Sequence, residues 1–239
     1  MALALITGGG SLIGEGIACC LAEEGWEVVV SDIDRARAEL VAAAIGEHAE
    51  PLGLDVTHRT EVTAAVDAIE KRHKQIDALV NCAGGFRGLG LTRKPFAETE
   101  PAEWDRILDA NLKGVLHCCH AVLPGMMRAG AGSIVSISAS RGLRGGPMAA
   151  LYSAAKAAII VFSQSLAQEV GKHGIRVNSI APGSAEARWK ALTAEDARGP
   201  MGRATTGRDV GNAVAFLLSD RAKHVTGSCL DVSGGTALH

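Results

Sequence analysis

Hydrophobic positions fall into short continuous runs, separated by longer segments in which apolar residues recur with helical spacing. The runs are rich in Val, Ile and Leu and typical of strands buried on both faces; they cover residues 3–7, 27–31, 76–81, 133–138, 176–180 and 229–232. Helical periodicity covers residues 14–24, 35–45, 60–71, 101–127, 152–172 and 207–218. This alternation predicts an α/β fold: a doubly wound, Rossmann-type parallel sheet with helices on both faces.

The chain reads as a single domain over residues 1–239, because no linker, charge block, low-complexity tract or repeat divides it. Glycine- and proline-containing stretches at residues 84–90, 141–147 and 182–200 follow predicted strands. Doubly wound sheets bind ligands at the carboxyl ends of their strands. We therefore expect these stretches to form the pocket, with residues 184–203 or thereabouts as a substrate-covering loop.

Composition narrows the range of partners. Hydrophobic residues make up 47% of the chain and the formal net charge is −2, which argues against disorder and against a surface built for nucleic acid or anionic lipid. A small-molecule substrate fits better, with no nucleic-acid or membrane partner. The six cysteines form no Cys-x-x-Cys pair, so we expect reduced thiols, no disulfide framework and no metal site.

The chain's start and its apolar segments bear on location. The first ten residues, MALALITGGG, are too short an apolar run for a signal peptide and lack a basic start. No later segment approaches the length of apolar residues needed to span a bilayer. These features predict a cytoplasmic protein.

A glycine-rich turn joins the first predicted strand to the first helix. It reads TGGGSLIG and contributes Gly8, Ser11, Leu12, Ile13 and Gly14. Glycines let the backbone approach a pyrophosphate, which then rests on the positive N-terminal end of the helix. The strict G-x-G-x-x-G spacing is absent, so the turn predicts dinucleotide binding mainly through its position in the chain.

Asp32 ends the next predicted strand, at the distance expected for a carboxylate that binds the adenosine ribose. A carboxylate there repels a 2′-phosphate, which favours NAD over NADP as the cofactor. Arg35 could reverse that preference by binding the phosphate. Asp32 could also be a solvated strand-end carboxylate or a helix cap.

Tyr152, the only tyrosine, lies four residues before Lys156 at the start of a predicted helix. Helical spacing places the phenol and the ammonium on one face. A nearby cation favours the ionised phenol, so Lys156 is expected to lower the pKa of Tyr152 from about 10 toward neutral pH. Such a phenol can exchange a proton with an alcohol or ketone.

With these residues in place, the chain resembles the short-chain dehydrogenase/reductase family over essentially its whole length. The shared markers occur in the family's order: TGGGSLIG from Thr7, the acid Asp32, LDVT from Leu54, NCAG from Asn81, NLKG from Asn111, SIVSIS from Ser133, YSAAK from Tyr152, IAPG from Ile180 and VTGSCLDVSGG from Val225. The resemblance implies hydride transfer between C4 of a nicotinamide and a carbonyl or carbinol carbon. It also implies a homotetramer formed through the long helices and the C-terminal segment.

The resemblance assigns a role to each matching position. Tyr152 would be the acid/base, Lys156 would hold the nicotinamide ribose and lower the phenol pKa, and Asn111 would kink its helix and hold a water that links the lysine to solvent. Cofactor contacts would come from further residues at the strand ends: Asp55 and Val56 at the adenine, Asn81, Ala83 and Gly84 along the adenosine ribose and phosphate, and Pro182 and Gly183 at the nicotinamide. Asn111 and Asp55 could instead serve helix and turn geometry.

Four positions depart from the family pattern. Leu12 replaces a glycine of the cofactor turn, Cys82 replaces an asparagine, Ala187 replaces a threonine that often contacts the nicotinamide amide, and Ala139 replaces the serine that binds the substrate oxygen. If strand alternation continued past residue 137, Ser138 and Ser140 would both face away from the side that Ala139 faces.

Ala139 leaves three explanations open. A local shift lets Ser138 or Ser140 serve, the alanine is a deliberate substitution, or the natural protein has lost activity. Loss of one such donor commonly lowers the rate on the order of 10²–10³-fold. The sequence therefore supports an NAD-dependent oxidoreductase, and as an alternative a catalytically impaired cofactor-binding or scaffold protein of the same fold.

Pocket candidates are mostly apolar: Phe86, Leu89, Leu91, Leu143, Met148 and Trp189. Ala139 and Arg144 are the residues most expected to face the substrate. Arg87, Arg141, Arg144 and Arg188 could pair with a substrate carboxylate or phosphate, or be solvated loop arginines. This set of residues fits a cyclic or medium-sized secondary alcohol or ketone as substrate. An acidic substrate of this kind is the alternative to a neutral one.

Overall fold

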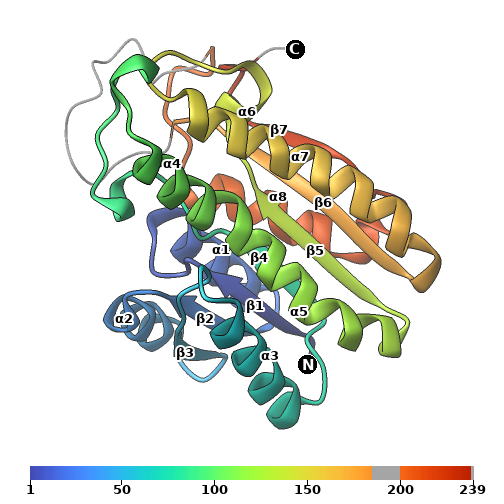
Figure 1. Ribbon diagram of the computed structural model, residues 1–239. Coiled ribbons are helices and arrows are strands. Elements are labelled where there is room, and N and C mark those ends of the chain that lie inside the picture. The colour runs from blue at the N-terminus through green and yellow to red at the C-terminus, as the bar shows by residue number, and fades with distance from the viewer. Residues whose placement is uncertain (185–199, 238–239) are drawn as a thin grey trace.

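The computed structural model describes residues 1–184 and 200–237. Within them, seven strands form one parallel sheet in the order β3-β2-β1-β4-β5-β6-β7 (Figure 1). The strands are β1 Leu3–Thr7, β2 Glu27–Asp32, β3 Ala49–Gly53, β4 Ala78–Asn81, β5 Gly132–Ile137, β6 Ile175–Pro182 and β7 Cys229–Val232. The order reverses between β1 and β4, which is where such sheets bind ligands.

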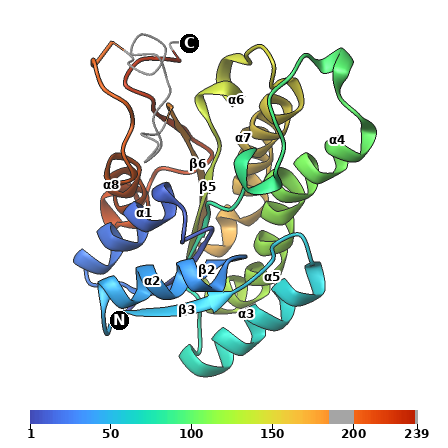
Figure 2. The same cartoon turned by 90° about the vertical axis from the view of Figure 1, so that its left-hand side faces the viewer.

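Helices cover both faces of the sheet (Figure 2). One face carries α1 Leu12–Glu23, α2 Arg35–Ile45 and α8 Gly207–Leu218, and the other carries α3 Arg59–His73, α4 Pro101–Leu108, α5 Gly114–Ala129 and α7 Ala150–Val170. The short helix α6 Ser140–Arg144 follows β5. The fold class predicted from the hydrophobic pattern is confirmed.

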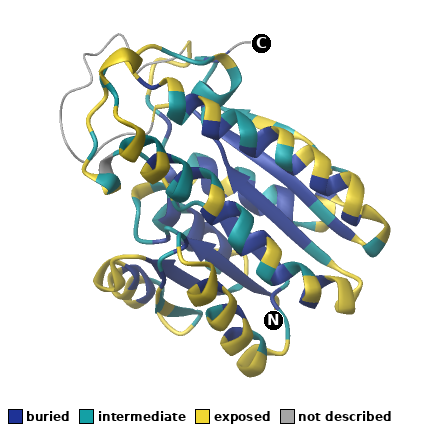
Figure 3. Cartoon of the chain, in the orientation of Figure 1, coloured by how far each residue is buried: buried dark blue, intermediate teal, exposed yellow. Residues whose placement is uncertain are grey.

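The two faces enclose two apolar cores. One packs α1, α2 and α8 against the sheet through residues such as Ile17, Leu21 and Val214, and the other packs α3, α5 and α7 through residues such as Val66, Val122 and Ile159. The strands are buried throughout the centre of the sheet (Figure 3). Burial of this kind supplies most of the stabilisation and fixes the loops at the carboxyl ends of the strands.

Two elements escaped the sequence pattern. β3 has the sequence AEPLG and is only partly buried at the sheet edge, so it lacks the continuous apolar run of a central strand. α6 begins at Ser140, directly after the backbone has left β5 at Ile137. The condition under which Ser138 and Ser140 would both face away from Ala139, a strand continuing to Ser140, is therefore not met.

The helical stretch Ala150–His173 corrects another expectation. By length and composition it is apolar enough to cross a membrane, although no such segment was expected. Residues such as Ile159, Leu166 and Val170 on this stretch are buried in the core that faces β5 and β6. Core helices of soluble proteins pass the same test, so the stretch is weak evidence for a membrane span.

Candidate active site

The glycine-rich turn is held in shape by its own hydrogen bonds. Ser11 caps α1: its Oγ accepts from the Gly14 amide at 3.1 Å and donates to the Gly8 carbonyl at 2.7 Å. Gly8 has a φ of +65°, which favours glycine. A side chain at Gly14 would collide with the Gly8 carbonyl. The turn therefore brings bare backbone to the start of the helix.

Two amides at that start are suited to an anion. The first hydrogen bond inside α1 runs from the Glu15 amide to the Ser11 carbonyl at 2.7 Å, so the amides of Leu12 and Ile13 have no acceptor within the helix. An anionic phosphate can accept from such groups and is favoured by the helix dipole. The Leu12 side chain is 36% exposed at this point, where the family resemblance expects a glycine.

Asp32 is buried beside the turn. Its Oδ2 accepts from the Gly10 amide and its Oδ1 from the Asp34 amide, each at 3.0 Å. The nearby arginines are occupied: Arg35 pairs with Glu39 at 2.9 Å, and Arg37 pairs with Asp34. The structure thus places a carboxylate, rather than a free guanidinium, at the predicted ribose position.

The other predicted cofactor residues lie along the same edge of the sheet. Asp55 Oδ1 accepts from the amide and the hydroxyl of Thr57, which closes the turn after β3. Val56 packs against Gly114 of α5. Pro182 ends β6, and the amide of the following Gly183 donates to the Val232 carbonyl at 3.2 Å.

Asn81 supports the site from beneath. Its side-chain amide donates to Ser136 Oγ at 3.1 Å, and its buried Oδ1 has no hydrogen-bond partner among the residues that the structure describes. The amides of Cys82 and Ala83 both donate to Thr7 Oγ1 at 3.2 Å. These bonds tie the loop after β4 to the end of β1, so Asn81 is buried in the sheet while Ala83 and Gly84 continue into the loop.

The start of α7 brings Tyr152 and Lys156 together. Lys156 is 4% exposed, and its Nζ donates to the Ile137 carbonyl at 2.9 Å. The same Nζ lies 5.9 Å from the centroid of the Tyr152 ring. Phe86, from the loop after β4, packs against the other part of the Tyr152 ring at 5.5 Å between centroids. The predicted pair is therefore one local cluster.

Asn111 lies in a π-helical turn, Asp109–Lys113, that joins α4 to α5. The wider turn frees the Ile107 carbonyl to accept from Asn111 Nδ2 at 3.0 Å, while Asn111 Oδ1 accepts from the Gly85 amide at 2.7 Å. A methyl group at Gly84 would lie 2.7 Å from Asn111 Oδ1 and 3.5 Å from Lys156 Nζ. Asn111 and Lys156 thus flank the same glycine.

The protonation behaviour differs from the sequence expectation. Burial raises the pKa of Tyr152, and the cations that oppose this effect are Arg93 and Arg141, not Lys156. Lys156 is itself buried, which lowers its pKa to about 8. The expected lowering of the Tyr152 pKa by Lys156 is therefore wrong for this structure, because desolvation acts on both groups.

Ala139 lies at the turn between β5 and α6, with extended backbone. Ser138 is buried, and its hydroxyl donates to the Lys156 carbonyl at 2.7 Å. Through that bond, Ser138 links the end of β5 to α7. Ser140 is buried at the first position of α6. A shift that lets Ser138 serve the substrate would have to break the bond to α7.

Cys82 is close to the cluster. Burial raises the pKa of its thiol to about 11, although the Lys156 charge and a hydrogen bond with Ser11 favour the thiolate. All six cysteines are free. Among residues 1–184 and 200–237, no group of three or more His, Cys, Asp or Glu side chains could hold a metal ion.

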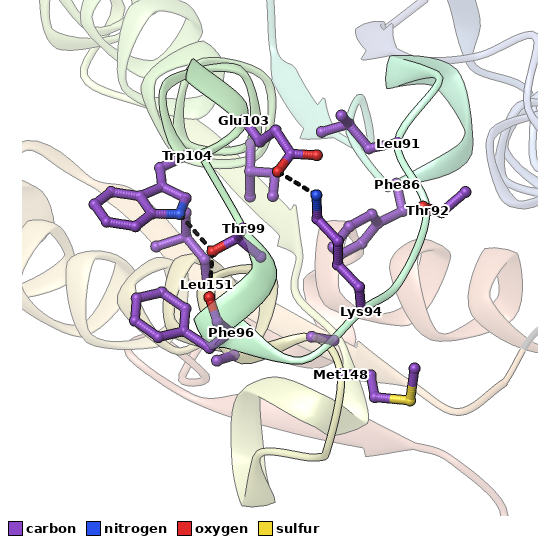
Figure 4. A pocket seen from close by; sticks show the side chains of 13 residues that line it. Phe86, Leu91, Thr92, Lys94, Phe96, Thr99, Glu103, Trp104, Met148 and Leu151 are labelled. Carbon is purple, nitrogen blue, oxygen red and sulfur yellow. Dashed lines mark hydrogen bonds and ion pairs between the residues drawn. The ribbon is translucent and has the colours of Figure 1, made fainter. Parts of the chain in front are cut away.

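A recess adjoins the cluster on the side of α4 (Figure 4). Its cavity volume is only about 20 Å³, and apolar side chains including Phe86, Leu91 and Met148 line it. An ion pair between Lys94 and Glu103 at 2.8 Å crosses one side. Phe86 both lines this recess and packs against the Tyr152 ring.

Several predicted pocket residues are exposed or lie outside the described residues. Arg144 is exposed at the end of α6. Ala187, Arg188, Trp189 and most of the expected substrate loop lie outside the described residues. Arg93, whose charge reaches Tyr152, is not among the residues predicted from the sequence. Nothing in its local sequence distinguishes it from other loop arginines.

Comparison with known proteins now bears on this arrangement. The protein-family model described as Enoyl-(Acyl carrier protein) reductase matches residues 10–237. The chain belongs to the short-chain dehydrogenase/reductase family. This confirms the resemblance drawn from the motifs, and with it an oxidoreductase family with NAD(P)-linked members.

Individual relatives cover nearly the whole chain. The chain is 36% identical to 2-(S)-hydroxypropyl-CoM dehydrogenase 3 of Xanthobacter autotrophicus, over 96% of this chain and 94% of that protein. It is 36% identical to a 3-oxoacyl-(acyl-carrier-protein) reductase of Vibrio cholerae, over 98% and 96% respectively. A crystal structure of 3-ketoacyl-(acyl-carrier-protein) reductase from Brucella melitensis, complexed with NADH, superposes with a TM-score of 0.92 at 33% identity, over 99% of this chain and 98% of that one.

The residues present fit a nicotinamide dinucleotide. The turn at Gly8 and Gly14 leaves backbone where side chains would collide, and the first amides of α1 lack helical acceptors. Asp32 lies beside the turn, at the predicted ribose position, and Gly84 lets the loop backbone pass close to Asn111 and Lys156. Leu12 places a large side chain at this turn, where the family resemblance expects a glycine.

Proposed function

We propose that this protein is an NAD-dependent oxidoreductase that transfers a hydride between the nicotinamide and a secondary alcohol or ketone. The observation that carries the proposal is the cluster of Tyr152, Lys156 and Asn111 at the carboxyl edge of the sheet, beside a glycine turn suited to a dinucleotide. The relatives named as dehydrogenases and reductases support the same reaction class. A small-molecule substrate and a cytoplasmic location are part of the proposal, with no nucleic-acid or membrane partner.

Each residue of the cluster has a defined task in this proposal. When bound, the nicotinamide supplies or accepts the hydride. Tyr152 takes the hydroxyl proton from the alcohol, or returns it to the ketone oxygen in reduction. Lys156 holds the nicotinamide ribose hydroxyls through Nζ, while its bond to the Ile137 carbonyl fixes its direction. Asn111 positions the loop at Gly85 that borders the lysine.

NAD is the proposed cofactor because Asp32 is buried at the ribose site and Arg35 and Arg37 are paired with carboxylates. A 2′-phosphate would meet the Asp32 charge without a free guanidinium to offset it. The Brucella melitensis neighbour was solved with NADH. NADP remains the less favoured cofactor.

The alternative is a catalytically impaired protein that binds the cofactor or serves as a scaffold. Ala139 favours it, because its methyl group cannot donate a hydrogen bond to a substrate oxygen, and Ser138 is engaged with the Lys156 carbonyl. Leu12 at the phosphate turn favours it as well. Retention of the Tyr152 and Lys156 pair favours the enzyme.

Cofactor titration separates the two functions. NADH and NADPH are titrated by their fluorescence, and a panel of secondary alcohols and ketones is then assayed with wild type and Tyr152→Phe. The proposal expects tighter binding of NADH than of NADPH and turnover that Tyr152→Phe abolishes with little change in NADH affinity. NADH binding without any turnover would establish the alternative, and no binding of either cofactor would reject both.

A further inference from the structure

Three arginines gather around the Tyr152 cluster from two loops. Arg93 comes from the loop between β4 and α4, and Arg141 and Arg144 come from α6. The positive charges of Arg93 and Arg144 both act on Arg141, and those of Arg93 and Arg141 both act on Tyr152. The guanidinium groups are therefore close enough to one another, and to the phenol, to share one local field.

This group lacks the carboxylates that usually balance such charges. Among residues 1–184 and 200–237, no acidic side chain lies within ion-pair distance of Arg93, Arg141 or Arg144. Some arginines elsewhere are paired with carboxylates, as in Arg208 with Glu23 at 2.6 Å and Arg128 with Glu70 at 3.0 Å. What sets Arg93 and Arg141 apart is that their unpaired charges both act on Tyr152.

Arg141 is the member whose position is most constrained. It is partly buried, its Nη1 donates to the Pro147 carbonyl at 3.3 Å, and a methyl group at Gly146 would overlap its guanidinium. Burial lowers the pKa of Arg141. Withdrawing an unpaired cation from water beside two others is unfavourable unless an anion completes the group.

The place of the group relative to the reacting atoms sets what it can bind. Arg141 lies two residues after Ala139, and Met148, next to its acceptor Pro147, lines the recess beside Phe86. Arg93 precedes Lys94, which lines the same recess but is already paired with Glu103. A substrate whose reacting carbon is at Tyr152 would thus carry its other end toward guanidinium groups and apolar side chains.

We propose that Arg93 and Arg141 bind an oxyanion substituent of the substrate, so that the natural substrate is a secondary alcohol or ketone bearing a carboxylate, sulfonate or phosphate. Guanidinium groups bind such oxyanions through paired hydrogen bonds. This inference rests on the proposed function, and it names the substrate class of the same site. It also supplies a fixed point that would hold the carbinol carbon where Ala139 offers no hydrogen bond.

The test compares a charged substrate with its neutral counterpart. Wild type, Arg93→Met, Arg141→Met and the remote control Arg128→Met are assayed with 3-hydroxybutyrate and with its methyl ester; a hydroxyalkyl sulfonate and a hydroxyalkyl phosphate distinguish the oxyanions. We expect Arg141→Met and Arg93→Met to lower kcat/KM for the charged substrates by about 10- to 100-fold relative to the ester. The ester corrects for any effect on Tyr152, since a loss at the phenol lowers turnover of acid and ester alike. Arg128→Met should leave both unchanged.

Other outcomes overturn the inference and leave the proposed function distinguishable. An equal fall for acid and ester would mean that the arginines act on Tyr152 and not on the substrate. Turnover of the ester with no preference for any oxyanion would reject the inference while keeping the oxidoreductase. If nothing is turned over, 3-hydroxybutyrate is titrated by calorimetry into NAD-saturated Tyr152→Phe, with and without Arg141→Met. Equal affinities in the two proteins would reject binding of the carboxylate by Arg141.

Discussion

Ala139 decides how fast the proposed reaction can run. It lies at the turn between β5 and α6, at the position where the family resemblance expects a serine that donates to the substrate oxygen. We expect Ala139→Ser to raise kcat for secondary alcohols on the order of 10²–10³-fold, because a donor aimed at the developing oxyanion stabilises the transition state more than the ground state. Steady-state kinetics at saturating NAD measure this change.

Ser138→Ala is the matched control for Ala139→Ser. The Ser138 hydroxyl donates to the buried Lys156 carbonyl, so its loss should lower the free energy of unfolding by about 1–3 kcal/mol and leave kcat nearly unchanged. If Ser138→Ala abolished turnover in a protein that remained folded, and Ala139→Ser changed nothing, Ser138 would be the working donor and the geometry described here would be misread.

Lys156 gives the molecule a pH-dependent stability. Its pKa is about 8 in the folded chain and about 10.4 in an unfolded one. Between these values the unfolded state binds the extra proton, so the free energy of unfolding rises with pH. Relative to Lys156→Met, wild type should gain roughly 1.4 kcal/mol per pH unit above pH 8 and show no trend below it.

The measurement is the difference between the unfolding free energies of wild type and Lys156→Met from pH 6.5 to 9.5, by urea denaturation. Burial raises the pKa values of thiols such as Cys118 and Cys119, which lowers stability above about pH 9. Both proteins share that trend, so it largely cancels in the difference. Lys172→Met, at an exposed lysine, is the control. A flat difference for Lys156→Met would show that Lys156 keeps its proton throughout this range.

At the scale of residues, the sequence predicts those contacts that follow from residue identity and helical spacing. The four-residue separation of Tyr152 and Lys156 on a helix led directly to their contact. Their pKa values did not follow, because these depend on how far each group is removed from water. The charges of Arg93 and Arg141 reach Tyr152 through the fold of two loops, and no local pattern encodes that approach.

The π-helical turn and the loop after β4 act together as one element. Gly84 and Gly85 have φ values of +135° and +114°, and the Gly85 amide and carbonyl both bond to Asn111. A methyl group at Gly84 would lie 2.7 Å from Asn111 Oδ1, whereas one at Gly85 would meet nothing within 4 Å. Alanine at position 85 would therefore strain only the backbone, whereas alanine at position 84 would strain the backbone and also collide with Asn111.

Gly84→Ala should be less stable than Gly85→Ala by about 1–3 kcal/mol, because only the first displaces the buried Asn111 side chain in addition to straining the backbone. Urea denaturation of both variants gives the difference, and NADH titration should show weaker binding for Gly84→Ala. Equal stabilities would indicate that Asn111 moves freely, and that it does not hold this loop against α5.

At the scale of elements, the apolar pattern predicted the central strands and the long helices, since burial on both faces leaves a continuous hydrophobic run. It failed at β3, where AEPLG at the sheet edge is only partly buried. It also failed at α6, a five-residue helix too short to show periodicity. The single predicted helix over residues 101–127 proved to be α4, the π turn and α5, because an inserted residue leaves no mark in composition.

Among the described residues, exposed apolar side chains include one on α7 and one on β7. Val161 of α7 is 61% exposed, and Leu230 of β7, the edge strand, is 38% exposed. Exposed apolar side chains and an unpaired strand edge both favour association. The homotetramer implied by the family resemblance would use the long helix α7 and the C-terminal segment, so these positions are where we expect copies to meet.

A single substitution tests that assembly. Four copies of the 24.6 kDa chain give about 98 kDa, which light scattering after size exclusion should find for wild type. Val161→Arg would place a charge in the predicted contact, where it must be desolvated without a partner, so the mass should fall. Leu40→Arg is the control, because Leu40 is 72% exposed on α2, outside the proposed contacts. A mass of 24.6 kDa for wild type, or an unchanged mass for Val161→Arg, would contradict association through α7.

Since α7 also carries Tyr152 and Lys156, loss of assembly should lower activity together with mass if packing between copies keeps the first turn of this helix in place.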